Sequence, residues 1–205
     1  MNISRILSTI VMLAGIVVMI GWIKDIDILK SILPIWVTMK FTTALCFLLS
    51  GSIVFILAGS LSKHTTSSRV VLPLLTLLIL LIMGTLLASS FLEIRTGVED
   101  LFVKETGGAI KTSTPGRPSA GTMTSFILVA TAGLLAMFKI QNLPSILRLV
   151  GWVVITLGLL AVLGYALDEP LLYYTLEGWS SAMAFHTALL FIVLGSTLCL
   201  SDQNS

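Results

Sequence analysis

Charged side chains are scarce in this sequence. Only 11% of its 205 residues are Asp, Glu, Lys or Arg, and 56% are hydrophobic, whereas about a quarter of the residues in a soluble domain are charged. The mean hydropathy is +1.05. The formal net charge of +2 is too small to indicate nucleic acid as a partner. The composition therefore predicts an integral membrane protein with lipids around it.

Cysteine is nearly absent as well, and no metal or haem motif occurs. Cys46 and Cys199 both lie inside apolar segments, where a thiol usually behaves as a small hydrophobe, so we expect no disulfide. There is no CxxC pair, no CxxCH motif and no other cluster with ligand spacing. The two histidines, His64 and His186, fall on opposite predicted sides of the membrane. We therefore expect no cofactor and no metal site.

Long uncharged runs are what the sequence has in abundance. Each is close to the roughly 20 apolar residues that cross the hydrocarbon core of a bilayer. Each must be helical, because an open strand would leave its backbone polar groups unsatisfied in lipid. The runs are 6–23, 41–60, 70–92, 122–138, 149–167 and 182–200. The first continues into a charged segment without a cleavage site, so we interpret it as a retained helix and not as a signal peptide.

A phrase of sequence recurs at the start of every second run. MKFTTALCFLLSG (39–51) and MAFHTALLFIVLG (183–195) share Met, Phe, Thr, Ala, Leu, Phe and Gly at the same spacing, and PSAGTMTSFILVA (118–130) is a weaker copy. The sequence therefore predicts an all-α integral membrane domain, residues 1–205, with six transmembrane helices arranged as three repeated helical hairpins. The hairpins are about 6–60, 70–138 and 149–200.

Positive charge is unevenly divided between the two predicted sides of the membrane. One side receives five bases and a single acid: Arg5, Lys63, Arg69, Lys139, Arg148 and Asp202. The other side holds nine acids against seven bases. Because short cytoplasmic loops carry an excess of Lys and Arg, we expect both termini in the cytoplasm.

The outer connections share an order of residue types, with an acid first and bulky apolar or aromatic residues after it. In 24–36 the apolar residues recur at helical spacing, which suits a short amphipathic segment at the membrane surface. The long connection 93–121 differs, because it contains GGAIKTSTPGRPSAG and little that is apolar. Such a segment lacks the apolar content to pack on its own, and we expect a mobile outer loop.

No Asp, Glu, Lys or Arg lies inside the runs, and His186 is the one histidine there, about one turn below the predicted outer surface. An ionisable group at that depth is costly and is a functional candidate by default. One interpretation is a neutral imidazole bonded to a neighbouring helix; the others are a pH sensor, a metal ligand or a ligand contact. Thr43, Thr122 and Thr187 open the second helices, where they can cap a turn, pack between helices or ring an outward-facing pocket.

Ion-driven transport and catalysis are both disfavoured. No Asp, Glu, Lys or Arg lies inside the runs, whereas proton- and ion-coupled transporters usually carry buried charge or broken helices. The titratable groups near His186 are the outer acids Asp168, Glu169 and Glu177, and these do not make a catalytic triad. We therefore predict that the protein is not an enzyme.

The segment GYALDEPLLYYTLEGWSSAMAFHTALLFIVLGSTL (164–198), with the two upstream copies of the phrase, resembles the multi-helix N-terminal membrane sensory region of bacterial histidine kinases and diguanylate cyclases. The residues that match are Gly164, Tyr165, Leu172, Tyr173, Met183, Ala184, His186, Thr187, Ala188, Phe191 and Gly195. The resemblance implies signal transduction at the bacterial cytoplasmic (inner) membrane. Cytoplasmic output domains follow this region in those families, whereas this chain ends at SDQNS, so we expect it to act through a partner.

We accordingly predict a stand-alone membrane sensory or accessory subunit that binds a small or lipophilic ligand near its outer face. Its partner would be another membrane protein or a second copy of the chain. The predicted ligand-binding residues are His186, Thr187, Tyr173, Trp179, Thr43 and Thr122. The alternative is a structural or assembly subunit of a larger membrane complex, and a facilitator for small neutral solutes is a third possibility.

Overall fold

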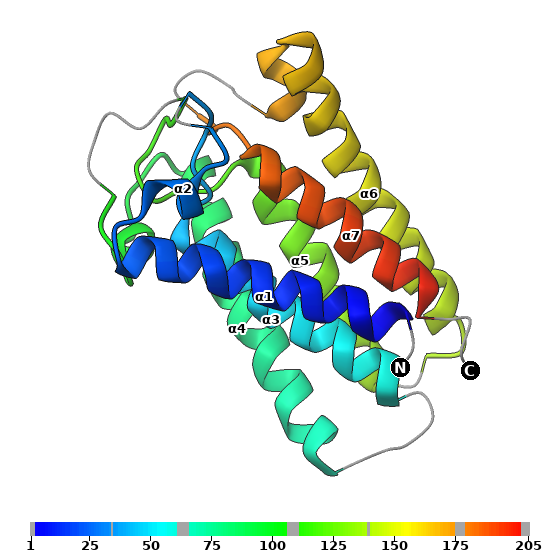
Figure 1. Ribbon diagram of the computed structural model, residues 1–205. Helices are drawn as coiled ribbons and strands as arrows, with labels where there is room; N and C mark the ends of the chain where they lie inside the picture. Colours follow the sequence, from blue (N-terminus) through cyan, green and yellow to red (C-terminus); the bar gives the residue numbers. More distant parts are fainter. Residues whose placement is uncertain are drawn as a thin grey trace.

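Helices are the main regular structure of the residues that the computed structural model describes, which are 3–33, 35–60, 66–105, 111–138, 140–174 and 179–201. The long helices are α1 (Ile3–Ile23), α3 (Phe41–Ser60), α4 (Thr66–Phe91), α5 (Ala120–Leu135), α6 (Leu143–Leu167) and α7 (Phe185–Leu200). The short elements are α2 (Asp27–Lys30), η1 (Val98–Asp100), η2 (Ala136–Phe138) and η3 (Pro170–Tyr173). Figure 1 shows the bundle that they form.

Five of the helices are long and apolar enough to cross a membrane, namely α1, α3, α4, α5 continued by η2, and α6. The predicted all-α membrane class is therefore confirmed. The sixth run is shorter than expected, because residues 182–184 are extended and only 16 residues are helical in α7. At 1.5 Å per residue α7 is about 24 Å long, against a hydrocarbon core of about 30 Å, so the sixth crossing stays a prediction.

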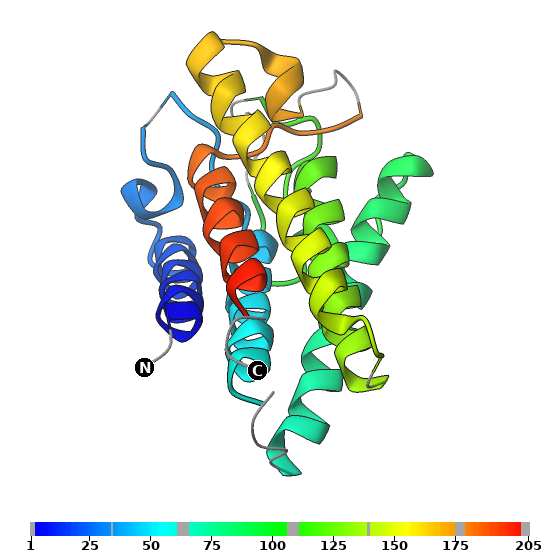
Figure 2. The ribbon, with the colours of Figure 1, turned by 90° about the vertical axis from the view of Figure 1, so that its right-hand side faces the viewer.

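The helices form an inner and an outer group. Burial differs among the helices over the most apolar 18-residue stretch of each. In α3 and α5, 61% and 50% of that stretch is buried, whereas the shares in α1, α4 and α6 are 28%, 33% and 33%. Each outer helix packs on two inner ones: α1 on α3 and α7, α4 on α5 and α3, and α6 on α7 and α5. Figure 2 shows α7 between α1 and α6. The second helix of each predicted hairpin is therefore an inner helix.

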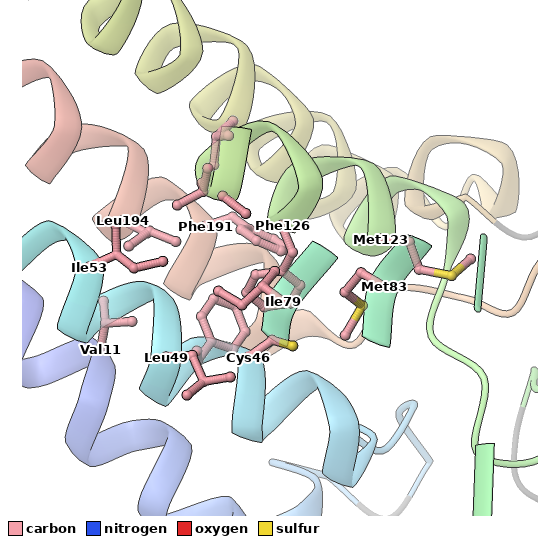
Figure 3. Close-up of a cluster of buried hydrophobic side chains, with 14 of the residues drawn as sticks. Val11, Cys46, Leu49, Ile53, Ile79, Met83, Met123, Phe126, Phe191 and Leu194 are labelled. Carbon is pink, nitrogen blue, oxygen red and sulfur yellow. The ribbon is translucent and has the colours of Figure 1, made fainter. Parts of the chain in front are cut away.

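Three phenylalanines meet where the inner helices converge. The ring centroids of Phe47, Phe126 and Phe191 lie 4.8, 4.9 and 4.9 Å apart, and all three side chains are fully buried. Their tilted and edge-on contacts are the arrangements that aromatic pairs prefer. Figure 3 shows Phe126 and Phe191 in the core, close to Ile79. Each of the three is the phenylalanine at the same position of the recurring phrase.

Glycine allows close approach of the helices in two of the hairpins. A Cβ atom on Gly51 of α3 would lie 3.0 Å from the carbonyl oxygen of Ser8 in α1, and one on Gly195 of α7 would lie 2.5 Å from that of Gly151 in α6. Small residues are the usual means by which membrane helices pack closely. Gly51 and Gly195 occupy the same place in the phrase, so this packing follows the sequence similarity.

The connections that follow α1, α4 and α6 gather at one end of the bundle, opposite to the described chain ends (Figures 1 and 2). We call it the capped end. The described part of the 93–121 connection packs more closely than its composition indicates, because four of its polar side chains are buried: Glu99, Glu105, Arg117 and Ser119. Two buried ion pairs hold it, one within the connection and one to Lys40, and composition alone does not reveal such pairs. Its expected mobility stays a prediction. Of the residues that set the predicted orientation, Lys63, Lys139 and Asp202 lie outside the described residues.

Candidate functional site

A buried ion pair ties the start of α3 to the long connection at the capped end. The Nζ atom of Lys40 lies 2.6 and 2.8 Å from the carboxylate oxygens of Glu105, and the two side chains are 4% and 6% exposed. Lys40 also donates to the Thr112 hydroxyl at 3.0 Å, and the Gly116 N–H donates to Glu105 at 2.6 Å. Burial lowers the pKa of the Lys40 ammonium, although Glu105 opposes that shift. The pair fixes both sides of the 106–110 segment to the first hairpin.

A second buried ion pair lies within the same connection. Nη2 of Arg117 donates to Glu99 at 2.7 Å and to the carbonyl of Ile94 at 2.6 Å. Glu99 also accepts from both the N–H and the hydroxyl of Thr96 and from the N–H of Gly97. Burial raises the pKa of the Glu99 carboxyl, but Arg117 and these donors outweigh it and hold the pKa below its usual value. Nε of Arg117 is buried and has no hydrogen-bond partner among the described residues.

A cleft of about 680 Å³ opens beside this second pair. Its walls are the end of α4 and residues 93–95, the segment 113–117, and Trp179. The Trp179 ring packs on Phe91 at 5.4 Å, and Arg117 lies in the wall with 5% of its surface exposed. Arg95 also lines the cleft, and its half-exposed guanidinium contacts Asp100 at 2.8 Å. We call this cavity the polar cleft.

A smaller cavity of about 150 Å³ adjoins an aromatic cluster. The cluster joins the rings of Trp36, Tyr165, Tyr173 and Phe185, with neighbouring centroids 4.7 to 5.5 Å apart. The Lys111 ammonium donates to the Tyr173 hydroxyl and lies 4.8 Å from the centre of its ring. A cation from the chain itself therefore already contacts the aromatic wall of this cavity.

The six predicted ligand-binding residues do not lie together in one cavity. Tyr173 lines the small cavity and Trp179 the polar cleft. His186, the second residue of α7, is half-buried, and its Nε2 atom has no hydrogen-bond partner within the described part of the chain. The threonines open the inner helices and are each 2% exposed: Thr43, Thr122 and Thr187. Their role in ligand binding stays a prediction.

The expected capping by threonine takes a different form in α5. The N-cap of this helix is Ser119, whose hydroxyl accepts from the N–H of Thr122 at 3.1 Å. The Thr122 hydroxyl lies 2.8 Å from that of Ser119, so both polar groups are satisfied locally. Thr122 therefore supports the helix start from its third residue, where it belongs to the first turn and not to the cap itself.

The charged residues of the capped end were not among the sequence-predicted site residues. Lys40 is the second residue of the phrase in its first copy, and Arg117 stands just before the second copy, so each basic residue lies close to the start of an inner helix. Their acidic partners Glu105 and Glu99 lie far away along the chain, so spacing alone does not pair them.

No group of His, Cys, Asp and Glu with the arrangement of a metal site occurs among the described residues. Comparison of the chain with protein-family models, with curated proteins and with solved structures found no match.

Proposed function

We propose that the chain is a sensory or accessory subunit of the bacterial inner membrane that binds a small ligand in the polar cleft and acts through a membrane partner. The observation that carries this proposal is a cleft of about 680 Å³ with a tryptophan and a buried arginine in its wall, in a chain that is otherwise strongly apolar. Polar groups converging on a concave site are typical of ligand pockets. The resemblance to sensory regions of kinases and cyclases supports the same assignment.

The position of the cleft would allow ligand binding to move the helices of the bundle. Its walls come from three places: the end of α4, the segment that leads into α5, and the residue Trp179, which shortly precedes α7. α5 and α7 meet in the core through Phe126 and Phe191. A ligand that draws the walls together would shift the starts of two inner helices relative to α4, and a partner packed on the outer helices would sense the shift.

The same proposal includes six membrane crossings in three related hairpins, with the capped end outside and both termini in the cytoplasm. The ends of the outer helices support it. An acid in left-handed conformation follows each of them: Asp25, Glu93 and Asp168, with φ of 55°, 54° and 53°. After each acid, the next N–H donates five residues back, to Gly21, Ser89 or Gly164, as in a Schellman motif.

The connections of the first and third hairpins support the repeat in more detail. The Met39 N–H donates to the carbonyl of Lys30 at 2.9 Å, and the Met183 N–H donates to that of Tyr173 at 2.8 Å. The carbonyls of both methionines in turn accept from an aromatic side chain at the end of the outer helix, Trp22 in one case and Tyr165 in the other. Two methionines that begin the phrase thus occupy equivalent hydrogen-bonded positions.

Tryptophan fluorescence of the protein in mild detergent tests the ligand-binding part. A small-molecule extract of the host cells should change the emission of the wild type saturably, and the change should disappear in Trp179→Phe. Trp152→Phe is the matched control, because Trp152 is 59% exposed on α6 and lies away from the cleft. An unchanged emission in wild type, or an equal response of the two variants, would contradict the proposal.

The second candidate function is a structural or assembly subunit of a membrane complex, and the outward face of α4 favours it. Val70, Leu74, Leu77 and Leu81 form an apolar stripe at helical spacing and are 64 to 67% exposed, so lipid or a partner covers them. An assembly subunit should copurify with its complex in mild detergent, and its deletion should dissolve that complex. A sensory subunit leaves the partner assembled when it is deleted.

A further inference from the structure

We infer that the polar cleft recognises a small organic anion, in which a carboxylate or phosphate group is attached to a flat or apolar body. Arg117 and Arg95 would bind the anionic group and Trp179 would contact the body. The inference rests on the proposed function and names the chemical class of its ligand.

The hydrogen bonding around Arg117 is the first argument. Its partner Glu99 accepts from four further donors, which come from Ser89, Thr96 and Gly97, so the carboxylate charge is distributed over many N–H and O–H groups. The guanidinium is less fully used. A guanidinium carries five N–H donors. Nη2 bonds Glu99 and Ile94, and Nε is closed to solvent and has no partner among the described residues. A carboxylate or phosphate would reach this unused donor once the wall of the cleft opens around it, and arginine binds such groups through its N–H donors.

The remaining walls of the cleft fit an anion with an apolar body. Arg95 is 53% exposed and held by one contact to Asp100, and exposed pairs of this kind contribute little, so its guanidinium is free to turn toward a ligand. Trp179 packs on Phe91 and also lines the cleft, so it offers an aromatic surface beside the arginines. Glu93 lines the cleft too, but it is exposed, and solvent screens its charge.

A comparison of isosteric probes tests the inference. Benzoate and phenyl phosphate should change the Trp179 emission saturably, whereas benzamide and benzylamine, which share the ring without the negative charge, should not. Arg95→Gln should weaken benzoate binding about tenfold, because a hydrogen bond to a charged group contributes enough for an order of magnitude. Lys104→Gln is the control: it removes a charge from an exposed residue that follows η1 and is not part of the cleft wall, and binding should not change.

Two short-chain lipids distinguish a free anion from a lipid headgroup. If dihexanoylphosphatidylglycerol competes with phenyl phosphate and dihexanoylphosphatidylcholine does not, the source of the phosphate is an anionic lipid headgroup. Equal binding of benzamide and benzoate, or an Arg95→Gln variant with unchanged affinity, would overturn the anion assignment. A response to cell extract without a response to any anionic probe would also overturn it and leave the proposed ligand-binding function intact. If neither the cell extract nor any anionic probe changes the emission, both the ligand-binding function and the anion assignment are refuted.

Discussion

Neutralising Glu105 should destabilise the protein strongly. Glu105→Gln keeps the size of the side chain and an acceptor for the Gly116 N–H, but it removes the charge that faces Lys40 at 2.6 Å. The Lys40 side chain is 4% exposed, so water does not replace the lost partner. Leaving one charge of a buried pair without its partner costs about 3–5 kcal/mol. We expect a loss of that size in the free energy of unfolding.

A double-mutant cycle isolates this contribution. Lys40→Met in the Glu105→Gln background removes the stranded ammonium, so most of the stability should return, because a buried pair replaced by uncharged groups is often neutral. Reversible unfolding in mixed micelles with increasing SDS, followed by tryptophan fluorescence, gives all four free energies. Arg95→Gln is the control, since it breaks a half-exposed pair and should change stability by less than about 1 kcal/mol. A Glu105→Gln variant within 1 kcal/mol of wild type, with no coupling to Lys40, would refute the reasoning.

Three further predictions use the same unfolding assay. Gly195→Ala should destabilise the protein by about 1–3 kcal/mol, because the new Cβ would lie 2.5 Å from a backbone oxygen of α6. Gly84→Ala is the control and should not destabilise it, since a Cβ there would meet no atom of the described residues within 4 Å. Equal effects of the two variants would contradict the close packing of α7 on α6. Phe126→Ala should lose about 3–5 kcal/mol, and Phe138→Ala, which is 68% exposed, should lose little. The depressed pKa of Glu99 adds stability that is fully present above its ordinary pKa of about 4.3 and is lost as the pH falls through the folded-state value. Glu99→Gln should therefore have a flatter acid-stability profile than wild type, and parallel profiles would exclude that contribution.

The helical framework follows from the sequence because a bilayer allows few alternatives. Uncharged runs in lipid must be helical, and the run 41–60 coincides with α3. The start of α7 differs, because residues 182–184 are apolar but extended. Apolarity alone does not say whether buried backbone is helical or is bonded elsewhere, as the Met183 N–H is to the carbonyl of Tyr173.

The capped end was harder to predict for a related reason. The 93–121 connection has the composition of a flexible loop, yet Glu99 and Arg117 are buried in it. Glu99 and Arg117 are each other's partners, and Glu105 pairs with Lys40 across the two hairpins. Only the folded bundle brings these partners close. Trp179 was among the predicted ligand-binding residues, but its neighbours in the cleft come from segments distant in sequence.

The account depends most on a chain that crosses the bilayer an even number of times, with the cleft facing outward. Single cysteines at Ile28 and Lys104 at the capped end, both exposed, and at Asn204 near the C-terminus, placed in a background without Cys46 and Cys199, can be labelled in intact cells with a membrane-impermeant maleimide. The proposed topology predicts labelling at the first two positions and none at Asn204 until the membrane is permeabilised. Labelling of Asn204 from outside, or protection of the other two, would contradict it.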